Sequence, residues 1–191
     1  MELVFATGNS HKLQEAQLIL GSRIPQLTLL PHDGSEPIES GSSFLENAMI
    51  KARAAFEATK KPAFADDSGI SVEIMGGAPG IFSAIWSGTR SDKTNRDLLL
   101  AQLVDIPQEH RQAAFVCTIA LVEKDSETSF TGIWPGRIAL GSTGDGGFGY
   151  DPVFVPEGFE VSAAELEPEV KSSFSHRALA MQQLADFLKQ R

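Results

Sequence analysis

The chain has 191 residues, of which 42% are hydrophobic and 21% are charged, a composition typical of a soluble globular domain. Its formal net charge of −9 excludes a protein that coats nucleic acid or an anionic membrane through bulk electrostatics. The only cysteine, Cys117, excludes an intramolecular disulfide and suits a reducing cytoplasm. Residues 1–12 resemble neither a signal peptide nor a membrane span. We expect one cytoplasmic domain over residues 1–191, with no nucleic-acid or membrane partner.

The first half of the sequence alternates predicted strands and helices. Apolar residues at helical spacing follow the first apolar run and stop at Gly21. Ser43 and Glu46 have the spacing of a capping box, which predicts the start of a second helix. In chain order we expect a strand at 2–7, a helix at 11–20, a strand at 27–30, a loop at 31–43, a helix opening at Ser43, and two strands at 62–66 and 70–74 around a turn at Ser68-Gly69.

The second half combines long strands with a glycine-dense loop. We expect a helix at 92–104, two long strands at 113–124 and 127–134 joined by a polar turn, a loop at 141–152, a short strand at 153–155, a weak helix at 162–171 ending near Pro168, and an amphipathic helix from Ser175. Together these elements predict an α/β fold with a mixed sheet and helices on its faces.

Asp66 and Asp67 are adjacent acids placed where the sequence predicts the end of a buried strand. One interpretation is a solvated turn, since Asp and Ser are common in turns. The other is a site for a hard cation, with Glu39 as a further oxygen ligand, because Mg²⁺ takes one or two carboxylates, waters and substrate phosphates. The four histidines are scattered without ligand spacing, which argues against zinc.

The stretch ATGNSHK follows the first predicted strand and leads into a helix. A Thr7-Gly8-Asn9 turn at a helix start exposes backbone N–H groups, which form a cradle for phosphate. Lys12 lies in the first helical turn, where an acid would be favoured unless a polyanion binds. The alternative is a plain strand-to-helix turn capped by Asn9 or Ser10.

The glycine-dense loop matches G-x-G-x-x-G from Gly144 to Gly149. That dinucleotide fingerprint requires a helix at its end, but an extended run follows here, so a nicotinamide cofactor is excluded. The loop presents Phe148 and Tyr150 among glycines, and stacking on a base is a plausible use of such aromatics.

Basic residues mark the start of the last predicted helix. Ser175 suits an N-cap, and His176 and Arg177 would oppose the helix dipole in the first turn. They form either a solvated basic patch or a set of donors for an anionic or carbonyl-bearing ligand. A triphosphate would need several such groups, here Lys12, Lys51, and Lys171 with Arg177.

Five stretches occur in order with fitting gaps: FATGNSHKLQE, ESGSSFLENAMIKA, FADDSGISVEIMGGAPGIFSA, GFGYDPVF and KSSFSHRALA. With them, the chain resembles the inosine triphosphate pyrophosphatase family, which hydrolyses dITP, ITP and XTP. The resemblance implies a single catalytic domain with a long mixed central sheet, two lobes around a nucleotide cleft, a Mg²⁺ cofactor and a homodimer. It implies cleavage of the α–β phosphate bond to nucleoside monophosphate and pyrophosphate, which removes nonstandard purine nucleotides from the pool.

The resemblance also assigns roles to individual residues. Asp67 is implied as general base and magnesium ligand, with Glu39 as the second metal carboxylate and Asp66 as a support acting through water. Phosphate contacts are implied for Thr7, Gly8, Asn9, Lys12, Lys51 and Lys171, and Ser68 would lie at the substrate. Contacts with the base are implied for Phe148, Gly149, Tyr150, Asp151, His176 and Arg177.

Three alternatives stay open at this point. A sister nucleotidase of similar fold would act on dTTP or modified pyrimidine nucleotides, and the SHR run after Lys171 favours the purine branch. A non-catalytic nucleotide-binding module would keep the lysines and aromatics without needing Glu39 and Asp67. An aspartyl-phosphate phosphatase is disfavoured, because its acids follow D-x-D-x-T rather than standing side by side. Members of the family often have two acidic residues before Ser40-Gly41, whereas this chain has Ile38-Glu39, so one supporting carboxylate is absent.

Overall fold

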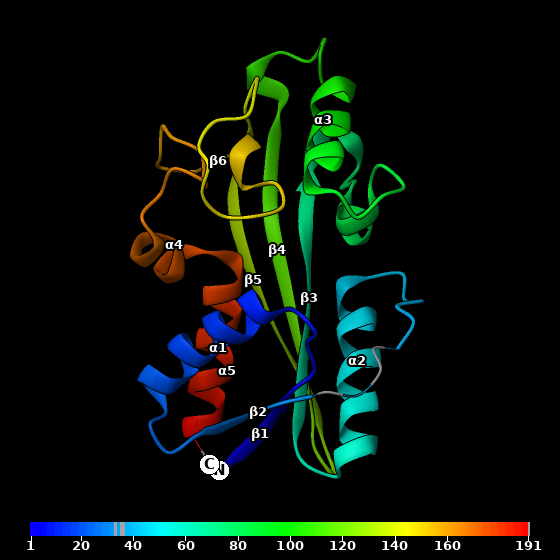
Figure 1. The fold of residues 1–191 in the computed structure, drawn as a ribbon, viewed down its shortest axis with the longest axis vertical. Coiled ribbons are helices and arrows are strands. Elements are labelled where there is room, and N and C mark those ends of the chain that lie inside the picture. Colours follow the sequence, from blue (N-terminus) through cyan, green and yellow to red (C-terminus); the bar gives the residue numbers. More distant parts are fainter. Residues whose placement is uncertain (33, 35–36, 191) are drawn as a thin grey trace. The chain divides into compact units, whose positions relative to one another are not determined.

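The computed structural model describes residues 1–32, 34 and 37–190, which form a six-stranded sheet with helices packed on it (Figure 1). The strands are β1 (Glu2–Phe5), β2 (Thr28–Pro31), β3 (Ala63–Val72), β4 (Gln112–Val122), β5 (Glu127–Ile138) and β6 (Phe154–Pro156). The helices are α1 (Ser10–Arg23), α2 (Phe44–Thr59), α3 (Asp92–Gln102), α4 (Pro168–Phe174) and α5 (His176–Lys189). Short 3₁₀ turns lie at Glu73–Met75, Gly80–Ile85, Gln108–His110 and Asp151–Val153. Positions 33, 35 and 36 of the predicted loop lie outside the described residues.

The sheet contains both parallel and antiparallel pairs. Its order is β2-β1-β3-β4-β5-β6, in which β1 pairs in parallel with β2 and β3, and β5 pairs antiparallel with β6. The predicted mixed α/β fold is therefore confirmed. None of the helices in the described part of the chain has the length and apolar character that a membrane span requires.

The chain divides into two compact units. The first unit comprises Met1–Asp67, Cys117–Gly132 and His176–Arg191, and the second comprises Ser68–Val116 and Ile133–Ser175. The boundaries fall inside β3, β4 and β5, so each of these strands contributes residues to both units. The single domain and the nucleotide cleft expected from the sequence stay predictions.

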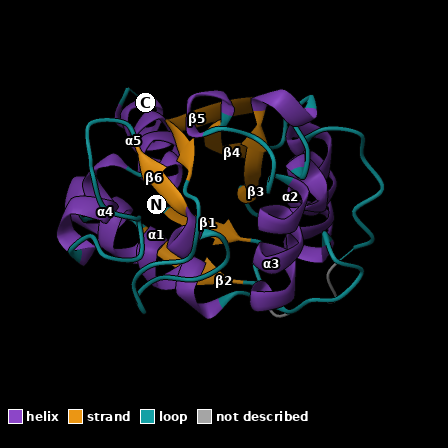
Figure 2. Cartoon of the chain, turned by 90° about the horizontal axis from the view of Figure 1, so that it is seen from above, coloured by secondary structure: helices purple, strands orange, loops and turns teal. Residues whose placement is uncertain are grey.

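In the first unit, different helices cover the two faces of the sheet (Figure 2). Phe5 and Phe64 pack with α1 and α5 on one face, where their rings stack with centroids 4.3 Å apart. Ala63 and Ala65 pack with small side chains of α2 on the other face. Because successive residues of a strand point to opposite faces, even and odd positions of β3 belong to different layers.

The start of α2 is fixed by the predicted cap. Ser43 Oγ accepts a hydrogen bond from Glu46 N at 3.2 Å, and Glu46 Oε2 accepts one from Ser42 N at 2.6 Å. The returning bond of the capping box thus goes to Ser42 rather than to Ser43. Asn47 Oδ1 also accepts from Gly41 N at 2.8 Å, so the loop that carries Glu39 is tied to the first turn of α2.

The second unit has a core of its own. Apolar side chains of β3, α3, β4 and β5 surround Phe154, whose ring meets Phe115 edge-on at 4.6 Å between centroids. Arg111 is buried and donates to the carbonyl oxygens of Leu103 and Ala139. This guanidinium joins the end of α3 to the segment after β5.

The turn predicted at Ser68-Gly69 is wrong, because β3 runs through it without interruption from Ala63 to Val72. Serine and glycine are common in turns, which is why the sequence favoured one. Gly69 instead serves a close approach, since a Cβ atom there would lie 2.4 Å from both Gly80 O and Ser83 Oγ.

Two helix boundaries also differ from expectation. The helix expected to end near Pro168 begins there, because proline has a preset φ and needs no hydrogen-bond partner for its nitrogen in the first turn. The first helix continues through Gly21 to Arg23, since a single glycine costs a helix only about 1 kcal/mol relative to alanine.

Candidate active site

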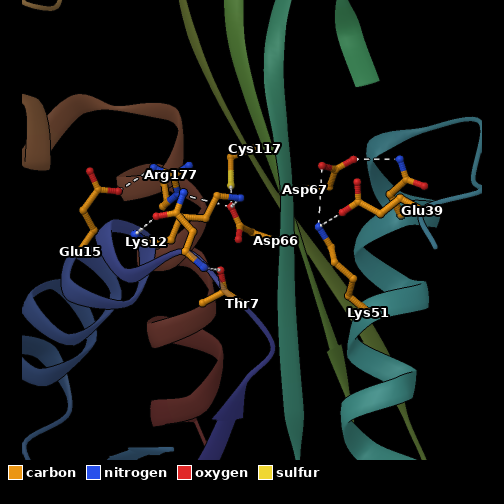
Figure 3. A network of polar contacts seen from close by, with 11 residues as sticks. Thr7, Lys12, Glu15, Glu39, Lys51, Asp66, Asp67, Cys117 and Arg177 are labelled. Carbon is orange, nitrogen blue, oxygen red and sulfur yellow. Dashed lines mark hydrogen bonds and ion pairs between the residues drawn. The ribbon is translucent and has the colours of Figure 1, made fainter. Parts of the chain in front are cut away.

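Asp66 and Asp67 lie in the middle of β3 and point to opposite faces of the sheet (Figure 3). Asp66 faces α1 and α5, and Asp67 faces α2. Strand alternation therefore gives each carboxylate its own partners. The expectation that Asp66 supports the metal beside Asp67 is corrected, because Glu39 lies with Asp67 on the other face.

Asp66 is the centre of a buried charged network in the first unit. Its side chain is 1% exposed, and its Oδ2 lies 2.9 Å from Lys12 Nζ and 3.4 Å from Arg177 Nε. Cys117 Sγ lies 3.8 Å from the same oxygen, and Arg177 Nη1 donates to Glu15 Oε2 at 2.6 Å. Asp66 Oδ1 has no hydrogen-bond partner within the described part of the chain.

The cations around Asp66 determine its ionisation. Burial alone would raise the pKa of this carboxyl, but the charges of Lys12, Arg177 and Lys51 outweigh burial and hold the pKa well below its usual range. Burial, together with the charge of Asp66, raises the pKa of the Cys117 thiol. At neutral pH Asp66 is thus an anion, and Cys117 is a neutral thiol.

Asp67 lies beside side chains from α2 and from the loop before it. Asn47 Nδ2 donates to Asp67 Oδ2 at 3.1 Å, and Lys51 Nζ lies 3.9 Å from Asp67 Oδ1. The same ammonium lies 2.5 Å from Glu39 Oε1. Asn47 and Lys51 are four residues apart, so one face of α2 brings both to this position. The structure therefore brings together Asp67, Glu39 and Lys51, which the resemblance had assigned to one site.

The surroundings of Asp67 make it a stronger base than an exposed aspartate. Burial raises its pKa and Glu39 adds to the rise, whereas Lys51 and Asn47 oppose it, and the net shift is upward. A raised pKa brings a carboxylate closer to the range in which general bases operate at neutral pH. Two neighbouring aspartates thus have pKa values shifted in opposite directions.

The carboxylate oxygens on the Asp67 face are suitable ligands for a magnesium ion. Two carboxylates share one ammonium there, which shows that this position attracts positive charge. No group of three or more His, Cys, Asp or Glu side chains is arranged to hold a metal among the described residues. Mg²⁺ does not require such a group, since waters and substrate phosphates complete its six ligands. Asp67 and Glu39 as metal ligands stay a prediction.

Residues of the turn between β1 and α1 line a small pocket together with Lys51. Asn9 Oδ1 accepts from Lys12 N at 3.3 Å and so caps α1, and Asn9 N donates to Thr7 Oγ1 at 3.2 Å. Thr7, Gly8 and Lys51 line one small pocket of the first unit. The side chain of Lys12 pairs with Asp66 instead, so of the three lysines predicted to hold phosphate, Lys12, Lys51 and Lys171, only Lys51 lines this pocket.

In the second unit, Phe148, Asp151 and Lys171 lie together. Asp151 is 3% exposed, and its Oδ2 accepts hydrogen bonds from Lys171 Nζ at 2.5 Å and from Phe148 N at 2.8 Å. Lys171 Nζ also lies 5.2 Å from the centre of the Phe148 ring, within cation–π range. Phe148 comes from the predicted loop, Asp151 from the 3₁₀ turn that follows it, and Lys171 from α4.

Tyr150 and Ser68, which the resemblance places at the substrate, are both at least partly buried. Tyr150 is 4% exposed within the core of the second unit, and its hydroxyl donates to Ser83 O at 2.8 Å. Its ring offers almost no free surface for stacking on a base, so the role implied for it is disfavoured by burial. Ser68 follows Asp67 inside β3 and is half-buried.

His176 and Arg177 open α5 in the first unit. They are 7% and 3% exposed, so the solvated basic patch is excluded. Arg177 pairs with Asp66 and Glu15, and its implied contact with the base stays a prediction, as does that of His176.

Asn47 is a site residue that the sequence analysis missed. It is 3% exposed and donates a hydrogen bond to Asp67, although it carries no charge and no role was assigned to it within the stretch ESGSSFLENAMIKA. Its signal was available, because a polar residue one helical turn before Lys51 on an otherwise apolar helix face is unusual.

Comparison with known proteins places the whole chain in one family. The model of the Ham1 family matches residues 3–187. The chain is 51% identical to the dITP/XTP pyrophosphatase of Leifsonia xyli subsp. xyli (strain CTCB07), with 99% of this chain and 96% of the relative covered. It is 47% identical to the dITP/XTP pyrophosphatase of Mycobacterium tuberculosis (strain ATCC 25618 / H37Rv), with 98% and 95% covered.

Solved structures agree with this assignment. A HAM1 protein from Coxiella burnetii is similar with a TM-score of 0.93 and 38% identity, covering 100% of both chains. A nucleoside-triphosphatase / dITP/XTP pyrophosphatase from Mycobacterium abscessus is similar with a TM-score of 0.80 and 43% identity, covering 98% of this chain and 99% of that one. The resemblance inferred from the five sequence stretches is confirmed, and the chain belongs to the Ham1 family.

Proposed function

We propose that this protein hydrolyses the nonstandard purine nucleoside triphosphates dITP, ITP and XTP between the α and β phosphates. The products are a nucleoside monophosphate and pyrophosphate, so the reaction removes these nucleotides from the pool. The dITP/XTP pyrophosphatases that share 51% and 47% identity support the proposal. The observation that carries it is the Asp67 face, where a base of raised pKa lies beside a lysine and a second carboxylate.

Asp67 acts as the general base in this proposal. It takes a proton from the water that attacks the α-phosphorus in line, and the electron pair of the broken P–O bond leaves with pyrophosphate. Asn47 holds one carboxylate oxygen at 3.1 Å, which fixes the direction of the other. A positioned base of this kind contributes roughly 10²–10⁴-fold to the rate.

The phosphates are held by backbone N–H groups and by positive charge. The Thr7-Gly8-Asn9 turn leads into α1, where the positive end of the helix dipole favours an anion. Lys51 supplies a cation at the same pocket. A Mg²⁺ ion held by Asp67 and Glu39 would offset the charge of the phosphate oxygens and of the leaving pyrophosphate.

Selection of the base follows from its 6-keto oxygen. Donors aimed at this oxygen would face the amino group of adenine, and a buried polar group without a partner costs about 1–3 kcal/mol. The resemblance implies contacts with the base from Phe148, Gly149, Tyr150, Asp151, His176 and Arg177, and we assign stacking on the ring to Phe148, because Tyr150 is buried. Guanine shares the 6-keto group, so rejection of GTP must act at the 2-position of the purine.

Pyrophosphate release with Mg²⁺ from ITP, dITP, XTP, GTP, ATP and dTTP tests the proposal. We expect strong preference for the first three, with a monophosphate as the other product. Release from dTTP instead would keep the phosphate chemistry and move the specificity to pyrimidines. Binding without release from any nucleotide would contradict an enzymatic role.

The resemblance also implies a homodimer and a cytoplasmic location, which we include in the proposal. Sedimentation of the purified chain distinguishes one copy from two, and a fusion to a fluorescent protein reports the compartment. A monomer at micromolar concentration would contradict the first, and export from the cell would contradict the second.

A further inference from the structure

Two side chains of one helix bind both backbone polar groups of a single residue, Gly149, in the glycine-dense loop. Gly149 N donates to Asp92 Oδ2 at 2.8 Å, and Arg96 Nη1 donates to Gly149 O at 2.6 Å. Asp92 and Arg96 are four residues apart, so both lie on one side of α3. Gly149 has a φ of 58°, a left-handed conformation that glycine adopts at little cost. The two side chains therefore hold the most flexible type of residue in one orientation.

Gly149 lies between the two aromatic residues of this loop. Tyr150, on one side, is anchored by its hydroxyl to Ser83 O at 2.8 Å. Phe148, on the other side, is half-buried, and residues 141–147 before it are exposed. Phe148 N also donates to Asp151 Oδ2 at 2.8 Å, so Gly149 and Asp151 together set the orientation of Phe148. Fixing a flexible residue costs conformational entropy, and a loop ordered in advance spares a ligand that cost.

We propose that Asp92 and Arg96 are positioning residues that set the purine specificity of the enzyme, by fixing Gly149 and through it the ring of Phe148. This inference rests on the proposed function, in which Phe148 stacks on the base. A ring held in one orientation aligns the edge of the purine with its donors, whereas a mobile ring accepts purines that differ at the 2-position. Loss of either side chain therefore weakens the binding of ITP and lowers the ratio of kcat/KM for ITP to that for GTP.

The attachment of α3 does not depend on this pair. Leu99 and Leu103 are fully buried in the core of the second unit, and Asn95 Nδ2 donates to Ala84 O at 3.1 Å. Asp92 is exposed, and exposed charged groups contribute little to stability. A purely structural role would predict a change in melting temperature without a change in specificity, which is the opposite of our expectation.

The test compares Arg96→Ala and Asp92→Ala with two controls on the same helix. Lys93 and Asp97 form an exposed ion pair of the same spacing, 2.6 Å apart, that does not contact the loop, so Lys93→Ala and Asp97→Ala are matched changes. For Arg96→Ala and Asp92→Ala we expect the KM for ITP to rise about tenfold with kcat nearly unchanged, and the ratio of kcat/KM between ITP and GTP to fall by a similar factor. Asp92→Asn keeps an acceptor for Gly149 N and should stay close to the wild type.

Hydrogen exchange of the Gly149 amide provides a readout that needs no activity. We expect faster exchange in Arg96→Ala and Asp92→Ala and unchanged exchange in the two controls. An active enzyme whose ITP-to-GTP ratio is the same in Arg96→Ala as in the wild type overturns this inference alone. Unchanged exchange at Gly149 also overturns it. A wild-type protein that hydrolyses no nucleotide overturns the proposed function, and the claim about specificity with it.

Discussion

The two faces of β3 each carry an aspartate, and the pKa values of these two carboxyls are shifted in opposite directions. On one face, Asp66 is buried among two cations, and its pKa is held low. On the other face, Asp67 is 8% exposed, has a second carboxylate nearby, and its pKa is raised. The ion pairs of Asp66 stabilise the fold, whereas the raised pKa of Asp67 makes it the better base. The comparison shows how one strand supplies both an anchor and a base from consecutive positions.

The largest effect is expected for Asp67→Asn. The amide cannot take a proton from water, so hydrolysis of dITP should fall about 10³-fold. Steady-state pyrophosphate release measures the rate, and calorimetry with dITP checks that binding persists. A rate within tenfold of the wild type would remove Asp67 from the role of base.

The same substitution one residue earlier should act on stability. Asp66→Asn removes the anion shared by Lys12 and Arg177 and leaves buried charge without compensation, which costs about 3–5 kcal/mol. Urea unfolding followed by circular dichroism measures the loss. Glu57→Gln in the exposed pair with Lys60 is the control and should change nothing measurable.

The advantage of wild type over Asp66→Asn should depend on pH. The pKa of Asp66 is lower in the folded chain than in the unfolded chain, so its contribution is complete above about pH 4 and declines as the pH falls toward the folded value. Unfolding free energies of both proteins at pH 7 and pH 3 measure the difference. A gap that widens in acid would contradict the charge network around Asp66.

Lys51→Met sharpens the comparison on the Asp67 face. Loss of the ammonium should lower kcat/KM about 100-fold, because a cation at the phosphates is removed. Since Lys51 lowers the pKa of Asp67, the acid limb of the pH–rate profile should also move to higher pH. Lys124→Met, in an exposed turn, is the control. If the acid limb does not move, Asp67 is not the group whose ionisation sets it.

The smallest effect is expected for Glu15→Gln. Glu15 is at the outer end of the Asp66 network, with its side chain 32% exposed, and Arg177 keeps Asp66 as a partner without it. Partly exposed ion pairs contribute about 1 kcal/mol or less, so unfolding by urea should shift only slightly. A loss as large as that of Asp66→Asn would mean that Glu15, and not Asp66, neutralises Arg177.

The sequence predicted much of the fold and the residues of the Asp67 face, but not that Asp66 and Asp67 point to opposite faces of the sheet. The first five residues of β3 are buried whichever face they point to, so this segment lacks the alternation of apolar and polar residues that identifies a half-buried strand. Ser68 and Gly69 then suggested a turn, because nothing in the sequence shows that Gly80 and Ser83 approach Gly69 so closely. Contacts between segments far apart in sequence decide such points.

Contacts between distant segments also determine which residues position others, and sequence patterns do not reveal them. Asp92 and Arg96 contact Gly149, more than fifty positions away, and their spacing on α3 is shared by the solvent-exposed pair Lys93–Asp97. Local pattern cannot distinguish the two pairs. Motifs, by contrast, are local, which is why the turn at residues 7–9 and the cap at Ser43 were found from sequence.

Urea unfolding of Asp66→Asn and Asp67→Asn side by side at neutral pH tests the account most directly. A raised pKa means that ionised Asp67 costs stability above the pKa of the unfolded chain, so its neutral replacement should be as stable as the wild type or more so. Asp66→Asn should lose several kcal/mol under the same conditions, about 3–5 by the loss of a buried ion partner. Opposite outcomes for identical changes at adjacent positions are the result that the two-face account predicts. An equal loss of stability in both variants would contradict it.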